Sequence, residues 1–145
     1  MRVENRKARY EYHILERCEV GIVLKGQEVK SIRDGKVSLS DSYCKVVGDE
    51  VYVVGLHISP YPHSRDQLDP KRNRKLLLHR SELNRLIGKV SERGFTLIPL
   101  VLYLNSRGIV KLDLGICHGK KKYDKRESIK QRDIEREIRT QQKVA

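Results

Sequence analysis

Apolar side chains alternate with polar ones along much of this chain, with a period of two residues. Two runs in the second half show it most clearly: Leu100, Leu102 and Leu104, followed by Val110, Leu112, Leu114 and Ile116. Alternation of this kind turns one set of side chains to the same face of a β-strand, so each run predicts a strand with one buried face. Turn-forming residues at 105–108 separate the two runs, and we therefore predict a hairpin.

The same pattern predicts strands earlier in the chain. From Tyr10 to Leu24 apolar residues recur at alternate positions, with the segment LERCE as a bend or bulge inside the run. Residues 43–47 and 51–58 are rich in β-branched and aromatic side chains, and Gly48 and Asp49 between them predict a second hairpin. Residues 1–9 are polar and basic, which predicts an N-terminal arm.

Two segments carry helical spacing instead. In QEVKSIRDG, Val29 and Ile32 lie three residues apart and Gly35 provides a stop, which predicts a short helix whose other face presents Lys30 and Arg33. A second helix is predicted where apolar residues follow the spacing i, i+3, i+4, i+7: Leu83, Leu86, Ile87 and Val90. With about six strands and two inserted helices, we expect a mainly β chain that curls into a small antiparallel barrel.

The charge of the chain indicates the kind of partner. Its 145 residues include 31 Lys and Arg against 19 Asp and Glu, a formal net charge of +12. One domain is expected at this length. Such an excess of positive charge on one small domain favours a polyanion, through Coulomb attraction and the release of condensed counterions. We expect a nucleic acid, and a merely solvated basic surface is the alternative.

Cysteine usage and the N-terminal sequence bear on the compartment. Cys18, Cys44 and Cys117 lie far apart and form no CxxC pair, so we expect neither a disulfide framework nor a zinc site. Cys44 and Cys117 fall within strand patterns and are interpreted as small core residues. The first residues lack the apolar segment of a secretory signal, and no apolar run approaches the ~20 residues of a membrane span. This is typical of a cytoplasmic protein without a membrane partner.

No motif for catalysis stands out. The histidines form no HxxxH or HExxH pair, and the sequence contains no phosphate-binding glycine loop and no nucleophile elbow. We therefore expect no catalytic residues, no metal and no cofactor, and a protein that is not an enzyme.

A basic segment precedes the leucine run at 76–78. It places four cations in the span 70–75: Lys71, Arg72, Arg74 and Lys75. We interpret it as a loop that holds phosphates at the edge of a barrel, and a solvated loop is the alternative.

The chain ends in a segment of different character. Alternation stops after Gly119, and residues 120–145 contain ten Lys or Arg and five Asp or Glu. Ile134 and Ile138 are the only apolar pair at i, i+4 there, too little to offset a backbone ordering cost of roughly 1–2 kcal/mol per residue. We expect a folded body at 1–118 and a tail at 119–145 that is disordered when free and helical against a polyanion. A helix that folds back on the body is the alternative.

Several stretches, in this order, resemble one known family. They are NRKARYEYHI, GQEVKSIRDGKVSLSDSY, HISPY, DPKRNRKLLLHRSEL and GKKKYDKR, and they extend from about Asn5 to Arg139. The family is small protein B (SmpB), which binds tmRNA (SsrA RNA) in bacterial trans-translation. The resemblance implies an OB-type barrel with inserted helices and a basic C-terminal tail.

The resemblance also implies a function and partners. Members of the family bind the tRNA-like domain of tmRNA, promote its alanylation indirectly, and accompany it with elongation factor Tu and GTP to stalled ribosomes. The tail is expected to enter the empty mRNA channel near the decoding centre of the small subunit. The alternative function is a general OB-fold RNA-binding protein of the ribosome-associated or initiation type.

Two sets of site residues follow from matching the motifs. The tmRNA-facing set is Asn5, Lys7, Glu19, Lys30, Arg33, Leu77 and Lys111. The ribosome-facing set is Gly119, Lys120, Lys121, Tyr123, Asp124, Lys125 and Arg126. Physically, the cations can pair with phosphates, and Glu19 can orient an arginine or accept a hydrogen bond from a base or a 2′-hydroxyl. Leu77 is either an apolar contact with loop bases or a core residue, and Tyr123 can stack on a base.

Overall fold

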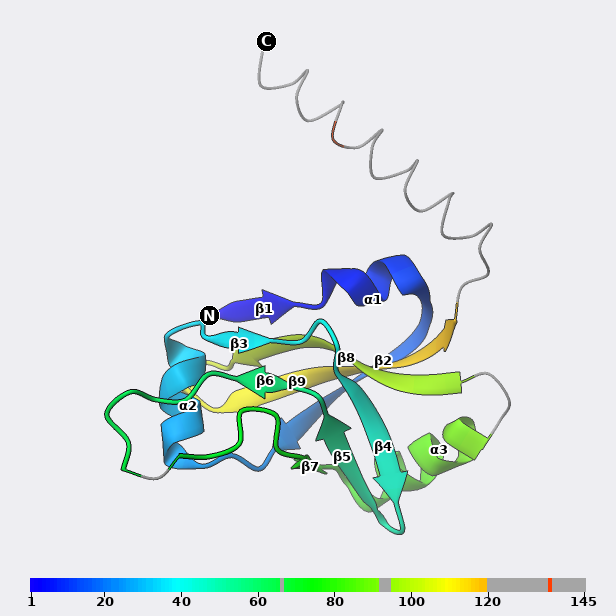
Figure 1. Cartoon of the computed structure of the whole chain (residues 1–145). Coiled ribbons are helices and arrows are strands. Elements are labelled where there is room, and N and C mark those ends of the chain that lie inside the picture. Colours follow the sequence, from blue (N-terminus) through cyan, green and yellow to red (C-terminus); the bar gives the residue numbers. More distant parts are fainter. Residues whose placement is uncertain (66, 92–94, 120–135, 137–145) are drawn as a thin grey trace.

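The computed structural model describes residues 1–65, 67–91, 95–119 and 136 (Figure 1). The helices are α1 (Arg6–Glu11), α2 (Gly26–Arg33) and α3 (Arg80–Ser91). The strands are β1 (Arg2–Glu4), β2 (Tyr12–Ile22), β3 (Val37–Ser38), β4 (Tyr43–Val47), β5 (Glu50–Val54), β6 (His57–Ile58), β7 (Arg74–Leu77), β8 (Phe95–Leu104) and β9 (Val110–Gly119).

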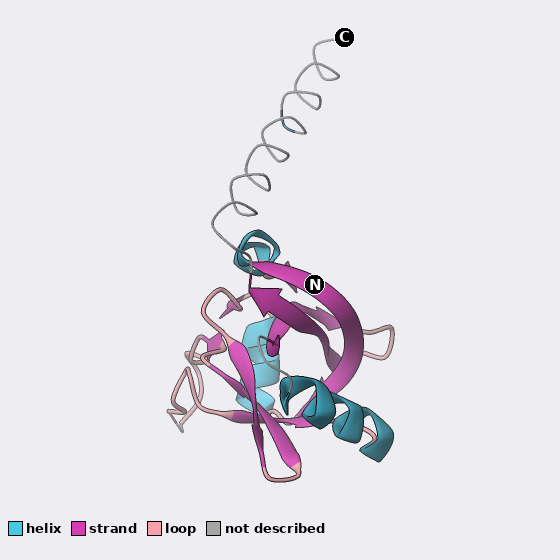
Figure 2. Cartoon of the chain, turned by 90° about the vertical axis from the view of Figure 1, so that its right-hand side faces the viewer, coloured by secondary structure: helices cyan, strands magenta, loops and turns pink. Residues whose placement is uncertain are grey.

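The main sheet closes on itself. Its strands pair in the order β1-β8-β4-β5-β7-β2-β9, and β9 pairs in turn with β8, which joins the two sides into a ring. All of these pairings are antiparallel. Figure 2 shows the strands curling around an interior, with α3 packed beside them. The predictions of a mainly β chain and of a small antiparallel barrel with inserted helices are confirmed, and the assignment to the OB type stays a prediction.

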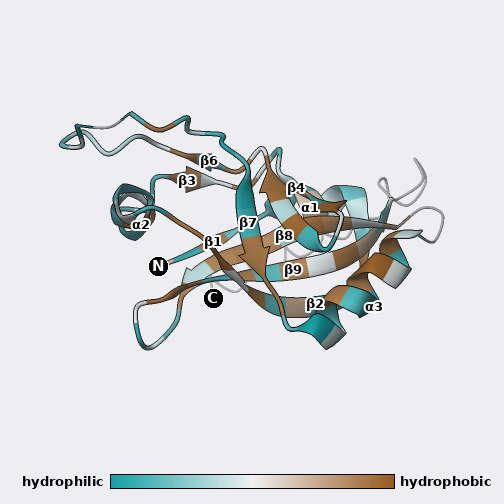
Figure 3. Cartoon of the chain, turned by 90° about the horizontal axis from the view of Figure 1, so that it is seen from below, coloured by the Kyte–Doolittle hydropathy of each residue, from teal (hydrophilic) through white to brown (hydrophobic). Residues whose placement is uncertain are grey.

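The barrel interior is the main hydrophobic core. Its buried members come from every strand of the ring, including Cys44 of β4. They include Val20 and Ile22 of β2, Val51 and Val53 of β5, Leu76 of β7, Leu97 and Leu102 of β8, and Val110, Leu112, Leu114 and Ile116 of β9. The alternation read from β9 is thus confirmed as one buried face. In Figure 3 the barrel strands contain many hydrophobic residues, whereas the long loop between β6 and β7 is mostly hydrophilic.

A second, smaller core lies outside the barrel. Ala8 of α1 packs there against Ile98, Leu100 and Val101 of β8 and against Cys117 of β9. Burial raises the pKa of the Cys117 thiol to about 11, so the group stays protonated, as suits a core residue. This layer explains why β8 is apolar on both faces: one face lines the barrel and the other lies under α1.

Two details of β8 and β2 differ from simple alternation. Leu100 was expected on the same face as Leu102, but it belongs to the outer core, because the register of β8 shifts between Pro99 and Val101. An extra residue in one strand reverses the facing of everything beyond it. In β2 the register shifts between Ile14 and Glu16, inside the segment that the sequence predicted as a bend or bulge.

The N-terminal prediction was wrong. Residues 2–4 are not a free arm but form β1, which pairs with β8, and the strand expected from Tyr10 begins only at Tyr12 because α1 extends to Glu11. The helix has no apolar periodicity of its own. It is held by Asn5, whose side-chain oxygen accepts a hydrogen bond from the Ala8 N–H at 3.1 Å, and by the burial of Ala8.

The strand β7 was also missed. The sequence placed its first two residues, Arg74 and Lys75, in a basic loop and predicted no strand for the leucine run that follows. They form instead the link in the barrel between β5 and β2. Buried Arg74 and Leu76 alternate there with exposed Lys75 and Leu77, so the polar residue in an inward position concealed the period-two pattern.

Candidate nucleic-acid interface

Residues from neighbouring strands form one straight row across the outside of the barrel. Leu77 of β7 lies opposite Gly21 of β2, Gly21 opposite Lys111 of β9, and Lys111 opposite Tyr103 of β8. The row continues to Arg2 of β1, which lies opposite Tyr103. Directly opposed residues in antiparallel strands share a face, so these side chains are neighbours on one surface. Residues far apart in the sequence, Leu77 and Lys111, are brought together in this way.

Leu77 projects from this row into solvent. The residue is 53% exposed, and its side chain lies over the backbone of β2, where a methyl group at Gly21 would come within 3.2 Å of the Leu77 Cβ. The absence of a side chain at Gly21 therefore leaves room for Leu77. Of the two interpretations of Leu77, the core residue is wrong and the exposed apolar contact fits the structure.

Glu19 lies beside the row, because it is two residues before Gly21 on β2 and therefore on the same outer face. Its Oε2 accepts a hydrogen bond from the hydroxyl of Tyr103. Asp113, on the neighbouring strand β9, lies opposite Glu19. Asp113 forms an ion pair with Arg17, whose Nη1 lies 3.3 Å from its Oδ2. Burial and the carboxylate of Glu19 raise the pKa of Tyr103 to about 12, which keeps the phenol protonated as the donor. Glu19 is thus held in place by a tyrosine rather than by an arginine, and it remains exposed.

The helix α2 extends the same surface with cations. Lys30 and Arg33 are both exposed in its last turn, where positive charge also complements the helix dipole. Arg33 reaches over the β8–β9 turn, since a methyl group at Gly108 would lie 3.7 Å from its Nη2. Exposed Arg107 neighbours Gly108 in that turn. The sequence treated 105–108 only as a turn and did not single out Arg107.

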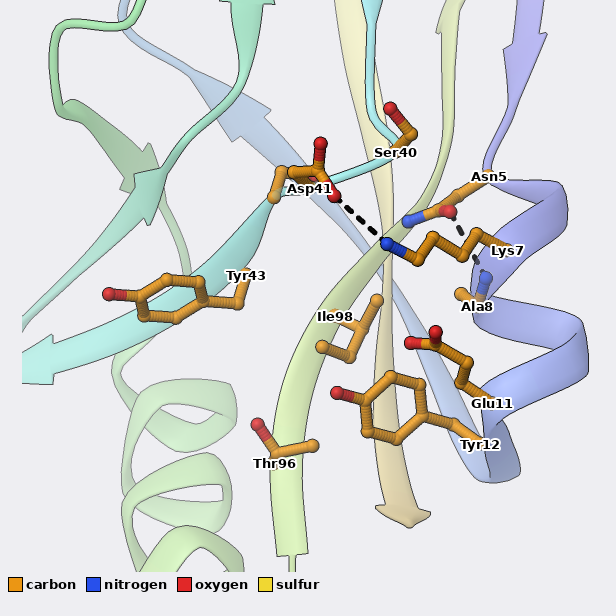
Figure 4. Close-up of a pocket in the computed structure, with 11 residues that line it drawn as sticks. Asn5, Lys7, Ala8, Glu11, Tyr12, Ser40, Asp41, Tyr43, Thr96 and Ile98 are labelled. Carbon is orange, nitrogen blue, oxygen red and sulfur yellow. Dashed lines mark hydrogen bonds and ion pairs between the residues drawn. The ribbon is translucent and has the colours of Figure 1, made fainter. Parts of the chain in front are cut away.

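Asn5 and Lys7 lie in a different place. They line a polar cleft of about 260 Å³ between α1, the 40–43 segment and β8 (Figure 4). Asn5 is only 4% exposed, and its Nδ2 donates to the carbonyls of Leu39 at 3.2 Å and Pro99 at 2.9 Å. Its amide is therefore used inside the protein, where it joins α1 to β8 and to the 39–42 turn.

Lys7 makes an exposed ion pair in this cleft. Its Nζ lies 3.0 Å from Oδ1 of Asp41, a contact that raises the pKa of Lys7 and lowers that of Asp41. Because both groups are solvated, a phosphate can replace the carboxylate at little cost. Lys7 therefore remains available to an RNA, whereas Asn5 acts in this structure as a positioning residue.

The basic loop at 70–75 is not a simple phosphate grip. Arg74 is 1% exposed and its Nε donates to Oε2 of Glu28 at 2.6 Å, while Arg72 Nε donates to the same oxygen at 3.2 Å. Lys75 pairs with Glu50 at 3.0 Å. Three of the four cations are thus matched by carboxylates, and two of them serve the fold. This corrects the sequence interpretation.

The tail begins at the far end of β9. Gly119 is exposed and lies opposite Tyr12, which also lines the cleft of Asn5 and Lys7. Gly119 is eight positions from Lys111 along β9, a distance of about 26 Å in a strand. The remaining ribosome-facing residues predicted from sequence lie outside the described residues: Lys120, Lys121, Tyr123, Asp124, Lys125 and Arg126.

The described residues contain no cluster of three or more His, Cys, Asp or Glu that could hold a metal ion. No helix among them is both long enough and apolar enough to cross a lipid bilayer.

Comparison with known proteins bears on this surface. The family model described as "SmpB protein" matches residues 2–144, almost the whole chain. The chain belongs to the SmpB family. An SsrA-binding protein of Acetivibrio thermocellus is 57% identical over 136 residues, covering 93% of this chain and 88% of the relative. An SsrA-binding protein of Chlorobaculum tepidum is 53% identical over 137 residues, covering 94% of this chain and 87% of the relative.

A solved structure supports the same SmpB assignment. It is described as "tmRNA-SmpB: a journey to the center of the bacterial ribosome", and its matching chain is 48% identical with a TM-score of 0.71. The match covers 88% of this chain and 94% of that chain. The family model, which matches residues 2–144, includes the barrel that carries the cross-strand row.

Proposed function

We propose that this protein is the RNA-binding adaptor of trans-translation, which binds the tRNA-like domain of tmRNA and brings it to stalled ribosomes. The observation that carries the proposal is the row on the barrel exterior, where Leu77, Lys111 and the neighbouring Glu19 lie on one surface. The name of the relatives, SsrA-binding protein, and the tmRNA-SmpB description of the solved structure support this choice of RNA.

The chemistry of the row suits a folded RNA with unpaired loop nucleotides. Lys111 and, on α2, Lys30 and Arg33 can pair with phosphates, which supplies most of the affinity. The Glu19 carboxylate can accept from a 2′-hydroxyl or a base amino group, and exposed Leu77 can lie against an unstacked base. A charge, an acceptor and an apolar contact in fixed relation give shape specificity that charge alone lacks.

The tail has a separate role in this proposal. Residues 119–145 would enter the mRNA channel of the small subunit near the decoding centre, while the barrel holds tmRNA together with elongation factor Tu and GTP. The placement of Gly119 and Lys111 toward opposite ends of β9 supports this division, since both partners could be reached at once. The protein would act by binding, and would promote alanylation indirectly rather than catalyse it.

Lys111→Ala tests the proposed interface, with Lys45→Ala on β4 as the matched control. Lys45 is an exposed strand lysine outside the row. Binding of the tRNA-like domain of tmRNA should weaken with Lys111→Ala, and the slope of log affinity against log salt should fall by about one. Lys45→Ala should leave both unchanged. Equal affinity for both variants and the wild type would overturn the assignment of Lys111.

A further inference from the structure

Two aromatic rings lie together in the loop between β6 and β7, beside the proposed interface. Tyr61 and His63 pack edge to face, with ring centroids 5.5 Å apart. The Nζ of Lys30, on α2, lies 5.2 Å from the centroid of the Tyr61 ring. His63 is exposed and Tyr61 is half-buried. The pair therefore joins a loop without regular structure to the helix that presents the basic residues.

A buried ionic network fixes this loop to the body. Glu28 of α2 is 4% exposed and accepts hydrogen bonds from Arg72 and Arg74, which flank the end of the loop. Arg74 also donates to the carbonyls of Leu56 at 2.7 Å and Pro70 at 3.1 Å. Charged groups buried in this way are costly to separate, so the end of the loop is held in one place.

Backbone contacts fix the start of the loop as well. The Ser59 N–H donates to the Lys36 carbonyl at 3.0 Å, and the Ile58 N–H donates to the Pro70 carbonyl at 3.0 Å. The Ser64 N–H donates to the Tyr61 carbonyl at 3.1 Å, which closes a turn around the two rings. The rings are thus presented at a defined position next to α2 before any partner binds.

We propose that Tyr61, His63 and Lys30 form a stacking site for an unpaired nucleotide of the RNA partner. The inference rests on the proposed function and adds to it Tyr61 and His63, which the sequence did not assign. Exposed His63, packed against Tyr61, offers a π-face for the base, and Lys30, over the Tyr61 ring, offers a cation for its phosphate. Since Lys30 lies one turn from Arg33, which reaches the β8–β9 turn, the site is continuous with the row.

The full-length protein and the tRNA-like domain of tmRNA provide the test. His63→Ala and Tyr61→Ala should each weaken binding, the latter by about tenfold, within the range of one lost base stack. Tyr61→Phe is the matched control, because it keeps the ring and removes only the hydroxyl, and it should bind within about twofold of the wild type. 2-Aminopurine placed at unpaired positions of the RNA should be quenched by the wild type and by Tyr61→Phe, but not by His63→Ala.

Ultraviolet cross-linking of the unaltered protein covers the case in which a variant fails to fold. A cross-linked nucleotide at Tyr61 or His63 supports the site, and cross-links confined to other parts of the chain overturn it. Wild-type binding of normal strength with no effect of either alanine variant would defeat this inference alone. Failure of the wild type to bind the tRNA-like domain would defeat the proposed function, and this inference with it.

Discussion

The hydroxyl of Tyr103, on β8, donates a hydrogen bond to Oε2 of Glu19, on β2, across the intervening strand β9. On β9, Lys111 lies opposite Tyr103 and Asp113 lies opposite Glu19. One tyrosine thus links the only acid assigned to the tmRNA-facing set with the lysine beside it. Glu19 is exposed and would otherwise sample several rotamers, so this bond selects one direction for its carboxylate.

Tyr103→Phe should therefore weaken RNA binding without unfolding the barrel. The loss should be roughly threefold to tenfold, in line with one net hydrogen bond of about 1 kcal/mol. Affinity for the tRNA-like domain of tmRNA is the measurement, and the melting temperature is the control. Unchanged affinity would mean that the orientation of Glu19 does not matter for binding.

The same contact predicts a late-titrating tyrosine. Burial and Glu19 raise the pKa of Tyr103 to about 12, so this phenol should remain protonated where an ordinary tyrosine ionises, near pH 10. Glu19→Gln removes the negative charge and should lower the pKa of Tyr103. Ring-carbon NMR of Tyr103 across alkaline pH measures both values, and an identical titration in the two proteins would contradict the link.

Among the acidic residues of the barrel region, removal of Glu28 should lower the free energy of unfolding the most. Glu28→Ala leaves Arg74 buried without its counter-charge, and the free energy of unfolding should fall by about 3–5 kcal/mol. Glu50→Ala is the matched control, because the Glu50–Lys75 ion pair is exposed and its loss should change stability little. Denaturant unfolding of both variants decides the point, and similar small losses would argue against a structural network.

Acidic pH should lower the stability of the fold through protonation of Glu28. Burial alone raises the pKa of Glu28, but hydrogen bonds from Arg72, from the Lys25 N–H and from Arg74 outweigh it, so the pKa lies below its ordinary value. The stabilisation by Glu28 is therefore present above the unfolded-state pKa, about 4.3, and is lost as pH falls through the lower folded-state pKa. Glu28→Gln should show a shallower loss of stability in this acid range than the wild type.

Two glycines should respond to alanine in opposite directions. Gly55 has φ of 78° and a methyl group there would lie 2.7 Å from the Asp41 carbonyl oxygen, so Gly55→Ala should destabilise the fold by more than about 1 kcal/mol. Gly88 lies inside α3 with nothing within 4 Å of a methyl group, so Gly88→Ala should stabilise it by about 0.5–1 kcal/mol. Melting temperatures of the two variants that shift in the same direction would contradict this prediction.

Much of the barrel was predictable because its signals are local. The β9 run and the helix at α3 follow a simple period, and their apolar residues do lie in one core. The errors occurred where tertiary contacts decide the outcome. The six residues of α1 have no apolar stripe and depend on Asn5 and Ala8, and β7 carries an arginine in an inward position that only Glu28, 46 residues away, makes tolerable.

The candidate site was predictable in part for a related reason. Residue type and motif indicated Lys111 and Leu77, but the register that aligns them through Gly21 is a property of the folded sheet. The structure shows that Leu77 is exposed and not a core residue, and that Asn5 is buried and not a surface residue. Tyr103 belongs to none of the matched motifs, and HISPY, which ends in Tyr61, suggested no role for that residue, so contacts with Glu19 and Lys30 mark the two tyrosines.

The central claim is that the barrel exterior recognises tmRNA specifically and not RNA in general. Competition binding tests it most directly, with the full-length protein, the labelled tRNA-like domain of tmRNA, and unlabelled ordinary tRNA elbow fragments as competitor at one fixed salt concentration. The account predicts that the tRNA-like domain binds at least about tenfold more tightly than the elbow fragments, a preference of about 1.4 kcal/mol. Equal competition by the two RNAs would contradict it and favour a general ribosome-associated RNA-binding protein.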